Sequence, residues 1–200
     1  SKEFIKNRNF KLTDLGEDDH LDYKNIDAQN TGFQNESFNF VIASNMIHHI
    51  PYPIKFFKEM NRILKKNGKL IIFESYCSLI FQLATIIMKH EGFDFTLDVW
   101  DEDNAKSDEN NAWHGNIAVP HLIFDDKKKF NEKLGDLFNI EHEELTECLI
   151  FLNSGGVTSK TKFIPMNRYF LNILNFIDRI LIKALPSIFC MGRRLVLVKT

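Results

Sequence analysis

Two continuous apolar runs flank a segment with helical periodicity in the first half of the chain. The runs are FNFVIAS at residues 38–44 and KLIIFE at residues 69–74, and such runs are typical of parallel strands buried on both faces. Residues 53–65 lie between them and end at Asn67-Gly68, a pair that commonly terminates a helix. Their apolar positions share one helical face: Ile54, Phe57, Met60, Ile63 and Leu64. The order strand, helix, strand predicts a right-handed parallel crossover.

The remaining segments extend this α/β pattern over one domain of residues 1–200. Residues 1–9 resemble the end of a helix, and residues 10–14 and 23–27 are predicted to be short strands. Further helices are predicted over residues 78–90, 127–137 and 166–185, and a strand within 140–151. Residues 153–190 form a mostly helical segment before the closing strand at 193–199, whose alternation RRLVLVK is typical of an antiparallel strand.

Composition places the chain among globular proteins and excludes several function classes. Of its 200 residues, 44% are hydrophobic and 26% are charged, and the net charge of −2 gives no reason to expect nucleic-acid binding. The three cysteines form no CxxC or Cys/His pattern, so neither a disulfide framework nor a zinc site is expected. With no apolar leader and no uninterrupted apolar span, we expect a cytoplasmic protein.

Histidines are the other common metal ligands, and their surroundings in the sequence do not favour a metal site. The four histidines considered lack a carboxylate or thiolate at short spacing that would complete a ligand set. They are His48, His49, His114 and His121. We therefore predict no bound metal.

A run of motifs between residues 27 and 74 is more specific than any of its parts. Asp27-Ala28 follows a short strand, and His48-His49 follows the apolar run. The helix then carries Glu-x-x-Arg-x-Leu-Lys at residues 59–65, before Gly68 and a strand that ends in Glu74. This order resembles the third to fifth strands of class I S-adenosylmethionine-dependent methyltransferases. The resemblance implies a Rossmann-like sheet with helices on both faces and an antiparallel last strand.

The resemblance also implies a cofactor site for S-adenosyl-L-methionine. Asp14 matches the acid at the end of the second strand, where a carboxylate accepts hydrogen bonds from both ribose hydroxyls. Asp27 corresponds to the acid that accepts from the adenine amino group, and the Ala28 backbone supplies a neighbouring ring contact. Ser44 and Asn45 follow the next strand at the edge where ligands bind in such sheets, although they could equally cap a helix.

His48 and His49 are the candidates for catalysis. Methyl transfer to an oxygen acceptor requires removal of a proton, and histidine is suited to this near neutral pH. His49 is favoured by its place in the family pattern, and the alternative is that either ring only packs within the turn. Trp113, His114 and Asn116 lie in a region that often folds over the acceptor in this family, or they belong to a surface loop. The implied function is methyl transfer to a small-molecule or saccharide-like acceptor.

One family feature is not found within the 200 residues. A glycine-rich G-x-G-x-G loop after a strand is absent, so we expect the first strand and its loop to lie upstream of residue 1. Residues 10–14 should then pair directly with 38–43, or a segment of another chain should fill the gap. A binding or scaffold protein that has lost the cofactor loop is the alternative function. A nicotinamide-dependent oxidoreductase is disfavoured by the motif run and by the lack of Tyr-x-x-x-Lys.

The helix predicted over residues 166–185 has an unusually wide apolar face. Its simplest interpretation is a helix that covers the core. The alternatives are a wall for a lipid-linked acceptor, a homodimer seam or a contact with a membrane surface. The apolar face comprises Tyr169, Phe170, Ile173, Leu174, Ile177, Ile180 and Leu181.

Overall fold

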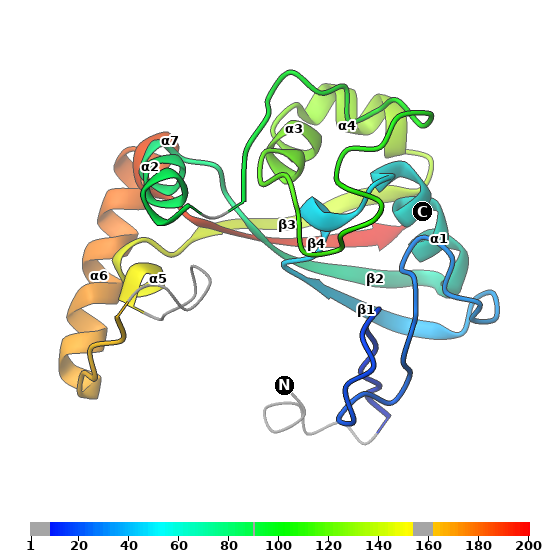
Figure 1. The fold of residues 1–200 in the computed structure, drawn as a ribbon, viewed down its shortest axis with the longest axis horizontal. Coiled ribbons are helices and arrows are strands. Elements are labelled where there is room, and N and C mark those ends of the chain that lie inside the picture. The colour runs from blue at the N-terminus through cyan, green and yellow to red at the C-terminus, as the bar shows by residue number, and fades with distance from the viewer. Residues whose placement is uncertain (1–8, 90, 154–161) are drawn as a thin grey trace.

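A computed structural model describes residues 9–89, 91–153 and 162–200 as a mixed α/β fold (Figure 1). Its sheet has the order β1-β2-β4-β3. β1 and β2 are parallel, whereas β4 is antiparallel to both β2 and β3, which confirms the predicted antiparallel last strand. The strand bounds are Phe38–Ser44 for β1, Leu64–Ser75 for β2, Phe138–Thr146 for β3 and Gly192–Lys199 for β4.

The main core lies between one face of this sheet and three helices. α1 (Pro53–Ile63) provides the crossover from β1 to β2, and α3 (Val119–Phe124) and α4 (Lys127–Leu134) cover the rest of that face. Phe56 and Phe57 of α1 are completely buried there. The burial of alternate residues along each strand follows from the period of two in a pleated sheet.

The opposite face of the sheet differs from the prediction of helices on both faces. The outward-facing side chains Phe40, Ile42 and Phe73 are exposed, and no helix of the described residues covers them. The sequence pattern predicted two buried faces because both runs are apolar throughout. In the structure only Val41, Ala43 and their neighbours on β2 are packed against helices.

A second group of helices, which we call the helical arm, lies beyond one end of the sheet (Figure 1). It consists of α2 (Leu79–Met88), α5 (Leu149–Asn153), α6 (Arg168–Ala184) and α7 (Pro186–Phe189). Ser78 and Asn167 cap α2 and α6 by accepting hydrogen bonds from backbone N–H groups of the first turn. None of the helices in the described ranges has the length and hydrophobicity needed to cross a membrane.

The two short N-terminal strands were predicted wrongly. Residues 10–14 and 23–27 contain a single bridge between Thr13 and Tyr23, and neither segment joins the sheet. Their backbone groups are instead satisfied within turns, as where Leu12 N–H donates to the Asp22 carboxylate and Gly16 N–H to the Asp14 carboxylate. Direct pairing of residues 10–14 with 38–43 is therefore also wrong.

The predicted strand within residues 140–151 ends early. β3 stops at Thr146, and Leu149–Asn153 form the short helix α5, because the Asp178 carboxylate accepts from the N–H groups of residues 148–150. The helix predicted over residues 127–137 ends at Leu134, and α3 was not predicted. The prediction for residues 1–9 falls almost wholly outside the described residues. So does most of residues 153–160, where the Ser, Gly and Thr residues predict a turn region.

Candidate active site

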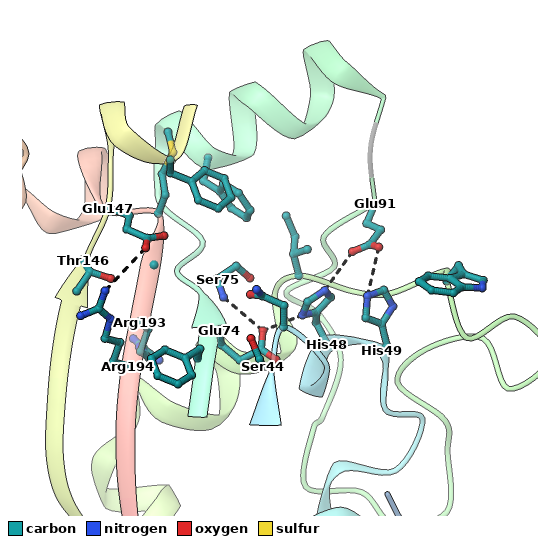
Figure 2. A pocket seen from close by; sticks show the side chains of 18 residues that line it. Ser44, His48, His49, Glu74, Ser75, Glu91, Thr146, Glu147, Arg193 and Arg194 are labelled. Carbon is teal, nitrogen blue, oxygen red and sulfur yellow. Dashed lines mark hydrogen bonds and ion pairs between the residues drawn. The ribbon is translucent and has the colours of Figure 1, made fainter. Parts of the chain in front are cut away.

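A cavity of about 460 Å³ opens at the edge of the sheet where β1 and β2 end (Figure 2). The end of β3 and the start of β4 reach the same edge, because these two strands are antiparallel to each other. Ser44 and Asn45 line the cavity from the end of β1. The predicted location of the site, at the carboxyl ends of the parallel strands, is thus where the structure has a cavity.

A sharp turn after β1 directs the chain toward this cavity. Asn45 adopts a left-handed backbone conformation with φ of 48°, which asparagine tolerates better than most residues. Its N–H donates to the Phe73 carbonyl oxygen at 2.7 Å, which fixes the turn against β2. The single-turn helix η1 (Ile47–His49) follows, and it presents both histidines at the edge of the sheet.

Glu74 holds η1 in place from the neighbouring strand. This carboxylate is 3% exposed, and one of its oxygens accepts from the N–H groups of Met46 and Ile47 at 2.8 and 2.6 Å. Its other oxygen lies 2.7 Å from His48 Nδ1. One buried acid thus satisfies two backbone donors and fixes the orientation of an imidazole ring.

His48 lies between two carboxylates. Its Nδ1 contacts Glu74, and its Nε2 lies 3.3 Å from Glu91 Oε2 on the opposite side (Figure 2). Burial by itself would lower the pKa of His48, but the charges and hydrogen bonds of Glu74 and Glu91 outweigh it and raise that pKa to about 10. His48 therefore carries its proton at neutral pH, and it can donate a hydrogen bond but cannot accept a proton.

His49 lies next to His48 and shares its acidic partner. The ring centroids are 4.2 Å apart, and His49 Nε2 lies 3.5 Å from Glu91 Oε1 (Figure 2). Gly115 packs against this pair so closely that an added Cβ would lie 2.8 Å from His49 Nδ1. Asn116 N–H donates to the His48 carbonyl oxygen at 2.8 Å. The loop around Gly115 therefore fixes the pair from the side opposite the sheet.

The rest of the cavity combines an apolar wall with polar groups, which include Ser75, Thr146 and Arg193. Phe81 of α2, Phe151 of α5 and Met191 form an apolar wall. Glu147 and Arg194 lie 4.0 Å apart across from them, and burial raises the pKa of the Glu147 carboxyl group. Apolar walls with a few convergent polar groups are typical of sites for small organic ligands.

Comparisons with known proteins find similarity to methyltransferases. A family model described as a methyltransferase domain matches residues 1–72. Phosphatidylethanolamine N-methyltransferase of Cereibacter sphaeroides is 22% identical over 133 residues, which cover 66% of this chain and 59% of the relative. The structure of an S-adenosylmethionine-dependent methyltransferase from Archaeoglobus fulgidus matches with a TM-score of 0.51 and 14% identity, over 94% of this chain and 74% of the other.

The chain is therefore similar to S-adenosylmethionine-dependent methyltransferases over its first 72 residues and in its fold. A second solved structure, phosphoethanolamine N-methyltransferase 2 of Haemonchus contortus with S-adenosyl-L-methionine, matches at 15% identity and a TM-score of 0.42, covering 92% of this chain and 38% of that one. The chain spans less than two thirds of the length of its curated relative. S-adenosyl-L-methionine is named in the descriptions of both solved structures.

The structure brings together only some of the residues predicted from this resemblance. Ser44, Asn45, His48, His49 and Trp113 all line the cavity. Trp113 lies at its rim with 83% of the side chain exposed. Asn116 is buried beside the histidine pair, where its amide group bonds to the backbone around Asp94 and Ala118. Its position favours a structural role in the loop.

The other predicted residues lie outside this cavity. The Asp14 carboxylate accepts from Gly16 N–H, and the Asp27 carboxylate accepts from both the backbone and the side chain of Gln29. Ala28 packs against the main core, and His114 N–H donates to the Asn111 carbonyl oxygen in the loop. The residues expected to hold ribose and adenine are therefore separate from those around the histidine pair.

The structure corrects the expectation that no carboxylate completes a metal-ligand set with the histidines. No carboxylate lies near His48 and His49 in sequence, but the fold supplies Glu91, and ligand atoms of these three residues lie within 4.8 Å of one another. Two imidazole nitrogens and a carboxylate oxygen are donors that zinc accepts. Because protonated His48 has one ring N–H facing Glu74 and the other facing Glu91, we interpret the cluster as a set of ion pairs.

Sequence reasoning missed the two acids that organise the site. Glu74 was noted only as the last residue of a strand, and its position at a carboxyl strand end was the available signal. Glu91 follows α2 in a segment without a motif, so its approach to the histidines depends on how α2 packs. Glu147 and Arg194 likewise meet through the antiparallel pairing of β3 with β4.

Proposed function

We propose that the protein transfers the methyl group of S-adenosylmethionine to a small-molecule acceptor, of which a saccharide-like compound is one class, bound beside His49. The match of residues 1–72 to a methyltransferase domain supports the reaction type. The observation that carries the proposal is the histidine pair at the end of β1, held by Glu74 and Glu91 and open to a cavity of suitable size. Cavities of this volume accommodate ligands of a few hundred daltons.

The cofactor itself supplies an electrophilic methyl group on a sulfonium. The described residues fit the acceptor side of such a site better than the cofactor side, because Asp14 and Asp27 do not line the cavity. Assignment of those two acids to ribose and adenine therefore stays a prediction. We assign the side chains around the cavity the tasks of orienting the acceptor, excluding water and accepting its proton.

We assign the proton transfer to His49. An acceptor hydroxyl or ammonium group must lose a proton as its oxygen or nitrogen bonds to the methyl carbon, and a neutral imidazole can accept that proton. Glu91 lies 3.5 Å from His49 Nε2, which stabilises the imidazolium that results. His48 is already a cation between Glu74 and Glu91, so we assign it a positioning role.

The acceptor would lie against the apolar wall of the cavity. Phe81 and Phe151 offer flat apolar surfaces, and Trp113 at the rim is placed to cover a bound molecule. Arg194 and Glu147 provide a polar end to the same cavity. The Cereibacter sphaeroides relative is named for an amine acceptor on a phospholipid, which supports including amines among the acceptors to be tested.

A second candidate function is cofactor-independent binding of a small molecule. The placement of Asp14 and Asp27 away from the cavity favours it. Calorimetry with S-adenosylmethionine and S-adenosylhomocysteine separates the two functions. The methyltransferase proposal predicts that both compounds bind and that Asp14→Ala weakens binding by about 1–3 kcal/mol. Absence of binding by the wild-type protein would favour the alternative.

A further inference from the structure

The helical arm exposes a continuous apolar face along α6. Side chains of Tyr169, Ile173, Phe176 and Ile180 follow one another at spacings of three and four residues, so they lie on one side of the helix. All four are exposed, and 64% of the Phe176 side chain is accessible to solvent. Soluble monomers rarely expose contiguous apolar surfaces of this kind unless a ligand or partner covers them.

The orientation of α6 is fixed by its opposite side. Asp178 is 2% exposed, and its carboxylate accepts three hydrogen bonds from the N–H groups of Cys148, Leu149 and Ile150. Ile182, one turn further along, is buried in the same direction. These contacts hold one side of α6, which lies at the periphery of the molecule (Figure 1), against the rest of the protein, and the apolar side chains on the other side are exposed.

Charges on the arm have a single sign at the surface. Within residues 79–89, 149–153 and 162–189, the exposed charged side chains are all cations, and the one acid, Asp178, is buried. They are Lys89, Lys162, Arg168, Arg179 and Lys183. The whole chain has a net charge of −2, so positive charge is concentrated on this part of the molecule. Arg168, Arg179 and Lys183 lie along one border of the apolar face.

We propose that the helical arm docks onto the surface of an anionic lipid bilayer through the apolar face of α6. A helix with a broad apolar face bordered by lysine and arginine lies in the membrane interface, where its apolar side chains enter the acyl region and its cations meet anionic headgroups. A second copy of the chain fits less well. Two copies packed through this face would place their cations close together, which opposes association.

The helical arm also lines the cavity, so the proposed membrane contact and the proposed active site lie in adjoining parts of the molecule. Phe81 of α2 and Phe151 of α5 line the cavity from the arm. Leu83, Ile86 and Ile87 of the same α2 helix are exposed on the outside. If the proposed methyl transfer holds, an acceptor embedded in or linked to a lipid would pass from the bilayer to His49 along the arm.

Cosedimentation with vesicles tests the docking without requiring activity. The protein is mixed with vesicles of phosphatidylcholine alone and of phosphatidylcholine with phosphatidylglycerol, in the absence of S-adenosylmethionine. We expect at least about tenfold stronger partitioning onto the anionic vesicles, decreasing as salt screens the cations. The paired substitution Phe176→Ser and Ile180→Ser should reduce partitioning by about tenfold or more. The matched control is Phe40→Ser with Ile42→Ser, which removes exposed apolar groups of the sheet.

Each outcome bears directly on the proposal. Circular dichroism of every variant confirms that it is folded, and Arg179→Gln with Lys183→Gln provides a second pair that leaves the apolar face intact. Equal loss of binding in the arm and sheet variants, or no binding to anionic vesicles, would overturn the docking. The docking would also be overturned if light scattering showed a dimer that the arm substitutions dissociate and if the wild-type protein did not bind vesicles. Failure of methyl transfer alone leaves the vesicle result unaffected.

Discussion

Two regions of the molecule differ from an ordinary protein surface in opposite ways. One is the cluster of His48, Glu74 and Glu91, which we call the corner, and the other is the outer face of α6. At the corner, charged groups are buried, and each contacts a partner at a defined distance. On α6, large apolar side chains are exposed while the one acid is buried. Buried polar groups and exposed apolar patches are the informative exceptions to the usual distribution. The comparison supports the two proposals, that the first region acts on a small molecule and that the second contacts another surface.

The largest effect should come from the acid that holds the corner together. Glu74→Gln leaves the His48 cation without its buried carboxylate and disturbs the bonds to Met46 and Ile47. We expect a loss of about 3–5 kcal/mol in the free energy of unfolding, measured by urea denaturation. Glu144→Gln, at an exposed ion pair with Arg194, is the control and should change it by less than about 0.5 kcal/mol. Similar values for both would mean that the corner is not a stabilised unit.

Two isoleucines on α6 allow its buried side to be compared directly with its exposed side. Ile182 is 8% exposed and Ile180 is 52% exposed, although only two positions separate them. Ile182→Ala should destabilise the protein by about 2–4 kcal/mol because it leaves a cavity, whereas Ile180→Ala should cost less than about 0.5 kcal/mol. Thermal or urea unfolding measures both. A cost above about 1.5 kcal/mol for Ile180→Ala would show that the outer face is covered in the isolated protein.

Loss of the Asp178 carboxylate, which holds the helical arm, should destabilise the protein less than loss of the Glu74 carboxylate. Asp178→Asn removes the charge that three backbone N–H groups contact, and we expect a loss of about 1–3 kcal/mol. Because the apolar face is unchanged, binding to anionic vesicles should be retained. Asp126→Asn, at the exposed cap of α4, serves as the control for loss of a capping carboxylate. Unchanged stability in Asp178→Asn would remove this residue as the anchor.

The corner also predicts a pH dependence of stability. His48 has a pKa of about 10 in the folded protein and about 6.5 when unfolded, so the folded state holds an extra proton between these values. Its contribution is complete below about pH 6.5 and declines as pH rises toward 10, by about 1.4 kcal/mol per pH unit.

The pH effect is best measured between about pH 7 and pH 8, below the range in which unfolded thiols ionise. Buried thiols have raised pKa values, about 12 for Cys77 and about 11 for Cys148 and Cys190, so they also destabilise the fold as pH rises, but only once unfolded thiols ionise. In this pH range, the free energy of unfolding of His48→Gln should decline less steeply with pH than that of the wild-type protein. An equally steep decline in the variant would assign the effect to other groups.

Elements with strong local signals were predicted well from the sequence. β1 was predicted with its observed bounds, and the observed α6 starts and ends within two residues of the prediction, because Asn167 caps it and Pro186 ends it. Residues 10–14 and 23–27 were not predicted correctly, because a short alternating pattern forms a strand only when a neighbouring strand is present. The exposed outer face of the sheet was missed for a related reason: a continuous apolar run shows that burial is possible, not what covers it.

Prediction of the site followed the same division. His48, His49, Ser44 and Asn45 line the cavity, and the sequence could place them there because they lie at or just after the end of a strong strand. Glu91 could not be found, because its contact with the histidines requires α2 and the loop around Gly115 to be placed in three dimensions. The raised pKa of His48 depends on Glu74 first and on Glu91 second, so the different tasks that we propose for the two histidines rest on contacts that only the structure shows.

Transfer of a labelled methyl group tests the central claim most directly. The protein is supplied with S-adenosylmethionine labelled in its methyl group, together with fractions of lipids, amines and saccharides, and label is followed into each fraction. We predict that the wild-type protein labels an acceptor and that His49→Gln does so at least about a hundredfold more slowly, with cofactor affinity unchanged by calorimetry. Absence of label in every fraction, or equal rates for the two proteins, would contradict the assignment of this cavity as a methyl-acceptor site.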